Sequence, residues 1–249
     1  MRSRLRPPGQ VLTLADRLDY FLTMRSETNL GGQRKGRTFI ETARRAQIMA
    51  AAIDTIAELG FGQASLARIA ERAGTSKGVI LYHFSGKDDL IRELVAELSA
   101  KGRAYMGPRL EAEPIGAGML RAYIESNLAF VRENRNHVLA TVEIALNGRS
   151  AVGSPLYDMS IRESGTAALR ELLVHFQAAG EFRADFDPAV MAMTLRATLD
   201  AVPARLARDP DLDLGHYGRE LADLFHIATR PEGSSHPGAA THEQSAEET

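Results

Sequence analysis

The sequence contains no cysteine among its 249 residues. Without cysteine the chain has no disulfide bonds, no thiolate metal ligands and no cysteine nucleophile. Aromatic residues are scarce at 6%, whereas 44% of the residues are hydrophobic and 25% are charged, close to the average of globular proteins. These proportions exclude a collagen-like chain, a fully disordered chain and a simple coiled coil.

Long hydrophobic runs are also missing, because no stretch approaches the roughly 18 consecutive apolar residues of a membrane-spanning helix. Residues 1–10 are rich in arginine and proline and lack the apolar run of a secretory signal. We therefore expect a cytoplasmic protein with no membrane partner.

Short motifs of catalysis and metal binding are absent as well. The sequence has neither His-x-x-x-His nor His-Glu-x-x-His, the spacings that place metal-binding histidines on one helix face. It also lacks a Gly-x-Ser-x-Gly elbow and a phosphate-binding glycine-rich loop. We expect no catalytic residues, no metal site and no cofactor.

Charge is distributed unevenly along the chain. Residues 1–37 carry a net charge of +5, residues 38–103 carry +1 and residues 104–249 carry −8. A basic front and an acidic rear suit a chain that approaches phosphate with one part only, although such blocks also occur as solvated surface.

The first half of the sequence predicts a long helix followed by two short ones. Apolar residues recur at helical spacing over 40–59, and Gly60 supplies a C-terminal stop. A short helix is expected over 66–72 with Ser65 as its N-cap, and Gly74 permits a tight turn after it. A second short helix is expected from Thr75 or Ser76 to Tyr82.

Helices are expected over most of the remaining chain. The Ser85-x-x-Asp88 spacing predicts a capping box for a helix that ends near Lys101. Pro155 and Pro188 suit first-turn positions, with Ser154 and Asp187 as caps. Because no strand-like alternation competes, we predict an all-α fold, with further helices over 117–134, 137–147, 155–179, 188–207 and 214–229.

Two short helices joined by a turn, with longer helices on both sides, match a helix-turn-helix by element length and order. The second short helix would enter the major groove of B-DNA, which is about 12 Å wide. Its first residues, Thr75, Ser76, Lys77 and Gly78, bring hydroxyls, a positive charge and an unhindered backbone to that groove. Alternatively, Thr75 and Ser76 serve only as a helix cap.

Three residues beyond this helix are candidates for contacts with phosphate. Lys87 stands in the first turn of the next helix, where free N–H groups and the helix dipole favour an anion. Tyr82 and His83 have polar tips on apolar side chains, whereas Phe84 is expected to anchor the core. Packing and solvent exposure alone are the alternative interpretation for each of them.

Residues 43–90 closely resemble the DNA-binding domain of TetR-type (TetR/AcrR) transcriptional regulators. The residues that carry this resemblance are Ile48, Gly60-Phe61, Ala64-Ser65, Ile69-Ala70, Ala73-Gly74, Ser76-Lys77-Gly78, Tyr82-His83-Phe84 and Lys87-Asp88. Two positions depart from the family pattern, which commonly has tyrosine or serine at Leu81 and valine at Thr75. Both departures alter the surface that would touch the bases and therefore affect the operator sequence.

The resemblance implies a set of DNA contacts. Base or groove contacts are expected from Thr75, Ser76, Lys77, Gly78 and Val79, and contacts to the DNA backbone are expected from Ser65, Arg68, Tyr82, His83 and Lys87. Arg44 and Arg45 are further candidates for phosphate.

The resemblance also implies the division of the chain. It predicts a TetR-type helix-turn-helix domain over residues 38–103 and a helical ligand-binding and dimerisation domain over residues 104–230. Composition and the lack of periodicity separately predict a flexible basic arm over residues 1–37 and a disordered tail over residues 231–249. The helices over 188–207 and 214–229 would pair with those of a second subunit, although an ordinary core explains their apolar residues equally well.

Several polar residues stand within or beside apolar segments of the second domain, where they either line a ligand pocket or belong to the surface or a satisfied core. They are Tyr123, Asn127, His137, Glu143, Asn147, His175 and Arg196. The sequence does not decide between these interpretations.

Two functional hypotheses follow. The first is a homodimeric repressor that binds a palindromic operator in double-stranded DNA and leaves it when an unknown small-molecule effector occupies the helical domain. The second is an all-helical small-molecule-binding protein or enzyme that does not bind DNA. The second hypothesis requires a convergent catalytic set, which the sequence does not display.

Overall fold

A computed structural model of the chain describes residues 39–150, 152–157 and 160–231. Expectations for the basic arm over 1–37, and for the tail beyond Pro231, lie outside these residues. The helices in the described part are α2 (Phe39–Leu59), α3 (Leu66–Arg72), α4 (Lys77–His83), α5 (Lys87–Glu111), α6 (Ala117–Glu133), α7 (Arg135–Asn147), α8 (Ser160–Ala178), α9 (Pro188–Arg208) and α10 (Leu214–Thr229). None of these helices combines the length and the hydropathy needed to cross a membrane.

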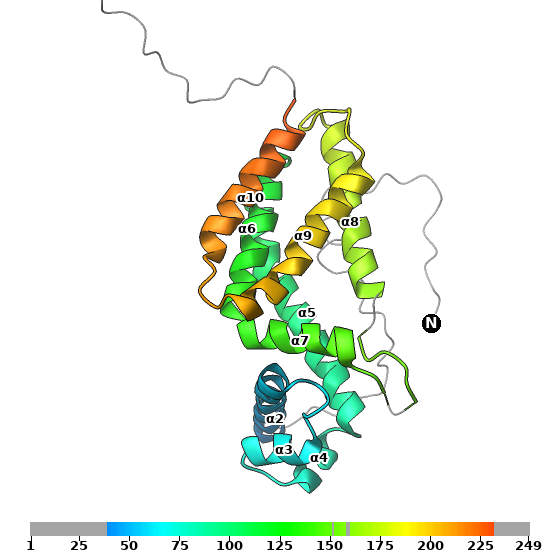
Figure 1. The fold of residues 1–249 in the computed structure, drawn as a ribbon. Helices are drawn as coiled ribbons and strands as arrows, with labels where there is room; N and C mark the ends of the chain where they lie inside the picture. The colour runs from blue at the N-terminus through cyan, green and yellow to red at the C-terminus, as the bar shows by residue number, and fades with distance from the viewer. Residues whose placement is uncertain (1–38, 151, 158–159, 232–249) are drawn as a thin grey trace, which may run out of the picture.

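The helices form two groups that α5 connects (Figure 1). At one end lie α2, α3 and α4, and at the other lie α6, α8, α9 and α10. The helix α7 crosses between the groups and packs on α2, α5 and α9. The all-α prediction is therefore confirmed for the described residues.

Each group has its own apolar core. The first core joins α2, α3 and α4 to the first turns of α5, and it also includes Ala140 and Ile144 of α7. The second core fills the space among α6, α8, α9 and α10 and takes in Leu110 near the end of α5. Because α5 contributes to both cores, the expected domain boundary after residue 103 falls inside a continuous helix.

Helix α5 differs from its prediction at both ends. It continues ten residues beyond Lys101 and through Pro108, because Leu110 is fully buried in the second core and this packing outweighs the proline. The predicted capping box is also wrong, because Gly86 is the N-cap and makes no side-chain cap hydrogen bond. Instead, the backbone N–H of Ser85 donates to the Asp89 carboxylate at 2.9 Å.

The helix predicted over 155–179 begins later than expected. Residues 149 and 155 form an isolated antiparallel bridge, so Pro155 closes a turn and does not start the helix. The segment returns to the first core through Leu156, which is 6% exposed. The predicted caps of two other helices are confirmed, since Ser65 caps α3 and Asp187 caps α9.

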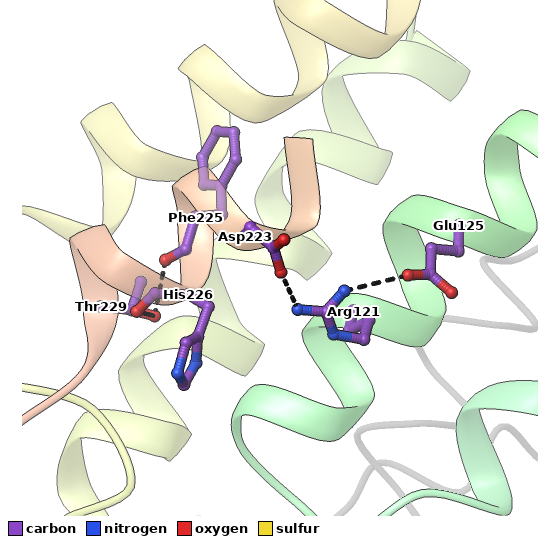
Figure 2. A network of polar contacts seen from close by, with 6 residues as sticks. All are labelled: Arg121, Glu125, Asp223, Phe225, His226 and Thr229. Atoms are coloured by element: carbon purple, nitrogen blue, oxygen red, sulfur yellow. Dashed lines mark hydrogen bonds and ion pairs between the residues drawn. The ribbon is translucent and has the colours of Figure 1, made fainter. Parts of the chain in front are cut away.

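Helix α10 is fastened to α6 by polar contacts as well as by apolar packing. The guanidinium of Arg121 on α6 donates to Asp223 of α10 and, at 3.1 Å, to Glu125 on its own helix. Figure 2 shows Arg121 between these two carboxylates, and the hydroxyl of Thr229 turned back toward the Phe225 carbonyl within α10. This arrangement fixes α10 along α6 and leaves its opposite face exposed.

Candidate nucleic-acid interface

The turn between α3 and α4 has the geometry that the sequence predicted. Gly74 adopts a φ of +60°, in the left-handed region that glycine occupies at no steric cost. The N–H of Thr75 then donates to the Ala70 carbonyl at 2.9 Å, which closes the end of α3. The chain therefore reverses within a few residues and enters α4.

Helix α4 is held from behind by the first core. Ile80 and Phe84 are 0% and 1% exposed. The guanidinium of Arg45 lies 4.0 Å from the centroid of the Phe84 ring and donates hydrogen bonds to the His83 carbonyl and the Glu93 carboxylate. The hypothesis that Arg45 contacts phosphate is therefore wrong, because its side chain is buried and fastens α2 to the end of α4 and to α5.

The opposite, N-terminal face of α4 is open. Ser76, Lys77 and Gly78 are exposed, whereas Thr75 and Val79 are half-buried. The Ser76 hydroxyl accepts from the Val79 N–H at 3.3 Å, so its predicted role as a cap is confirmed, and the residue remains at the surface. A Cβ on Gly78 would meet only this hydroxyl at 3.6 Å, an ordinary contact, so internal packing does not require glycine there.

The remaining residues expected to contact the DNA backbone surround this face. Tyr82 is 76% exposed, and its ring stands edge-on to that of half-buried His83 with 5.1 Å between the centroids. Ser65 is exposed and caps α3, while exposed Arg68 donates to the Gln63 carbonyl at 3.2 Å. Leu81, the position that departs from the family pattern, is also exposed, at 46%.

Lys87 is placed differently from what its position in the sequence suggested. Its ammonium turns back to donate to the Phe61 carbonyl at 2.9 Å and lies 4.0 Å from the centroid of the Phe61 ring. Burial lowers the pKa of Lys87, and the nearby Asp88 carboxylate partly offsets that effect. The lysine therefore braces the α2–α3 turn in the free protein, and its contact with phosphate stays a prediction.

The same turn is also held by α7. The N–H of Phe61 donates to the Glu143 carboxylate of α7 at 3.1 Å, while its carbonyl accepts from Lys87 of α5. Both backbone polar groups of Phe61 are therefore bound by other helices. Gly60 has a φ of +80°, and a Cβ there would lie 3.2 Å from the Glu143 oxygen. We call the contacts of Phe61 with Glu143 and Lys87 the Phe61 clamp.

Two further polar contacts attach α7 to the rest of the molecule. Asn136 donates to Asp54 of α2 at 2.9 Å, and Nε2 of His137 donates to the Leu94 carbonyl of α5 at 3.0 Å. Burial lowers the pKa of His137, which keeps the ring neutral at this contact. Sequence reasoning missed these couplings, because each joins residues that are distant in the chain.

Comparisons with known proteins agree with this geometry. Residues 48–94, which run from α2 to α5, match the family described as bacterial regulatory proteins, tetR family. This segment of the chain is therefore similar to the DNA-binding domain of that family. The match covers the whole of α3 and α4, together with Phe84 and Lys87.

Individual transcriptional regulators extend the comparison. The transcriptional regulator BetI of Escherichia coli is 34% identical over 82 residues, which are 33% of this chain and 42% of BetI. The chain thus spans less than half the length of this relative. The transcriptional repressor AcnR of Corynebacterium jeikeium is 28% identical over 66% of this chain and 82% of its own.

A solved structure supports the fold beyond the DNA-binding domain. FadR of Bacillus subtilis, solved in complex with stearoyl-CoA, is superposed with a TM-score of 0.58 over 72% of this chain and 96% of its own. At 20% sequence identity, this likeness shows the fold alone.

A lysine substitution tests the open face of α4. We expect Lys77→Ala to weaken binding to DNA and to reduce the slope of log affinity against log salt by about one, because one phosphate contact is lost. Lys101→Ala is the control, since that lysine lies on α5 and pairs with Glu97 one turn earlier. Salt titrations of both variants give the two slopes, and equal slopes would remove Lys77 from the interface.

Proposed function

We propose that this protein is a homodimeric transcriptional repressor that acts in the cytoplasm. It binds a palindromic operator through residues 65–84 and leaves it when a small molecule occupies the helical bundle. It acts by binding and not by catalysis. AcnR, which is named as a transcriptional repressor, is the comparison that supports repression in preference to activation.

The open face of α4 is the observation that carries this proposal. A short helix anchored from behind by Ile80 and Phe84 presents its first turn to the outside, where Ser76, Lys77 and Gly78 meet no other part of the described chain that would cover them. That is the arrangement by which a recognition helix reaches base edges in the major groove. Tyr82 and Arg68 are also exposed, and each carries a donor that can bind a phosphate oxygen.

The exposed side of α9 and α10 supports a dimer. On α9, exposed apolar residues recur at helical spacing at Val190, Met193 and Ala197. On α10, Leu224 and Ile227 are 64% and 55% exposed. Exposed apolar residues that recur on two helices are typical of a subunit interface. Two subunits would place two recognition helices about 34 Å apart, one turn of the duplex.

Helix α7 offers a route from the bundle to the DNA. It packs on α9 and, through Glu143, holds the N–H of Phe61 in the turn between α2 and α3. A ligand that binds better to one arrangement of the bundle shifts α7 and, through the Phe61 clamp, shifts α4. The solved complex of FadR with stearoyl-CoA is consistent with a small molecule in a bundle of this fold. Coupling of this kind typically changes affinity about 5- to 150-fold.

Selection of fragments from random DNA tests the proposed function. We expect the full chain, with no ligand added, to enrich an inverted repeat whose half-site centres lie about 10 base pairs, or a multiple of that, apart. The spacing follows from two identical recognition helices on one face of the duplex. Enrichment of no sequence would favour the alternative, a helical small-molecule-binding protein or enzyme.

A charge placed on the exposed face tests the dimer. We expect Leu224→Asp to convert the dimer into a monomer and to weaken operator binding at least tenfold, because an unpaired carboxylate would be buried in the interface. Leu146→Asp is the control, since Leu146 is similarly exposed, at 68%, but lies on α7 and is not part of the proposed interface. Analytical ultracentrifugation gives the mass of each variant. A Leu224→Asp chain that still sediments as a dimer would place the interface elsewhere.

A further inference from the structure

A charged side chain, Arg196, lies within the bundle on a helix that is not part of the candidate DNA interface. Arg196 is on α9, next to Leu195 and Leu199, which are 0% and 2% exposed. Its Nη1 donates to the Tyr123 hydroxyl of α6 at 2.8 Å, and its Nη2 donates to the Asp200 carboxylate at 2.7 Å. We call Arg196, Asp200 and Tyr123 the Arg196 cluster.

One donor of this cluster has no acceptor. The Nε of Arg196 is buried and has no hydrogen-bond partner among the residues that the structure describes, the only such side-chain atom there. Buried donors without a partner are rare in native proteins, because no hydrogen bond then offsets the free-energy cost of removing the donor from water. The cluster lies at the edge of the core, since a fifth of the Arg196 side chain and a fifth of the Asp200 side chain are exposed, although the Nε atom itself is covered.

The charges around this donor restrict what an added molecule can be. Tyr123, together with Asp200, raises the pKa of Arg196, so the guanidinium remains charged. Asp200 already balances that charge at 2.7 Å. A second carboxylate would leave a net negative charge in an apolar surrounding, and an ammonium group would supply no acceptor. An uncharged oxygen acceptor satisfies the donor without adding charge.

We propose that Arg196 Nε is the polar anchor for the effector, and that the effector is an uncharged, largely apolar molecule that presents a carbonyl oxygen to this N–H. The apolar part of the molecule would pack against the core that surrounds Leu195, Leu199 and Tyr123. This inference rests on the proposed function, because it names the effector that releases the DNA. The bound molecule would bridge α9 and α6, which pack on α7 and therefore connect to the Phe61 clamp.

Matched probes on the full-length protein test the proposal. The ketones 2-octanone, 2-decanone and 2-dodecanone are compared with the alkanoates and alkylammonium ions of the same chain lengths. Binding is measured by the shift of the thermal unfolding midpoint and by titration calorimetry, and release is measured with a labelled operator fragment. We expect at least one ketone to bind and to release the DNA, with about tenfold or greater preference over its charged counterparts.

Substitutions of Arg196 separate a binding role from a structural one. We expect Arg196→Met to lose ketone binding about 10- to 100-fold, as expected for the loss of a hydrogen bond from a charged donor. Arg196→Lys, which keeps the positive charge for Asp200 but has no Nε donor, should show the same loss and covers the case in which the methionine variant does not fold. Arg170→Met is the control, because Arg170 on α8 is half exposed and pairs with the adjacent Glu171.

The outcomes are distinguishable from failure of the proposed function. Binding of operator DNA by the unliganded chain tests that function and does not depend on any probe. Binding of no ketone, equal or tighter binding of the alkanoates, or unchanged ketone binding by a folded Arg196→Lys chain would each overturn the assignment of Arg196. A loss of stability in that variant with full ketone affinity would show that the cluster only joins α6 to α9.

Discussion

The two hydrogen bonds to the backbone of Phe61 are the constraint on which the rest of the structure depends. The Glu143 carboxylate of α7 accepts a hydrogen bond from the Phe61 N–H, and the Lys87 ammonium of α5 donates one to the Phe61 carbonyl. Two helices from different parts of the molecule therefore fix one residue. Gly60 permits this approach because its φ of +80° lies in the left-handed region, which glycine adopts without steric cost. The contact bears on the orientation of α3 and α4 relative to the bundle, since α3 begins at Leu66, soon after Phe61, and α4 follows α3 through one turn.

One face of α4 packs on the core, and the other is exposed for contact with DNA. Ile80 and Phe84 bury its back, and Arg45 adds a stacked guanidinium and hydrogen bonds that secure its last turn. The front carries small and polar groups, which cost little to leave in water and can exchange hydrogen bonds with DNA. A helix this short has little stability of its own, so the core behind it keeps the front in place.

Local signals in the sequence predicted most of the fold. The helices 66–72 and 214–229 have the predicted bounds, because a cap or a glycine marks their ends and tertiary packing does not override the signal. The extent of α5 could not be predicted, since its continuation through Pro108 depends on the burial of Leu110 against a distant helix. The start of α8 was missed because a proline after serine is equally compatible with a helix cap and with the turn that forms.

The candidate site was partly predictable for the same reason. The exposed front of α4 follows from the short helix and its turn, and the residues of that front were named from the sequence. Arg45 differs from its predicted role, and Lys87 makes contacts in the free protein that the sequence did not indicate. Each has an aromatic ring and a backbone carbonyl within reach that only the folded chain brings close. Glu143 carries no local signal at all, since its partner lies 82 positions earlier in the chain.

Hydrogen exchange at the amide of Phe61 tests the central claim most directly, namely that α7 holds the DNA-binding unit in place through this contact. In Glu143→Ala, compared with the control Glu111→Ala, we predict that the Phe61 amide exchanges about tenfold faster and that operator affinity changes in the same sample. An amide as well protected as in the wild type, with unchanged operator affinity, would contradict the account.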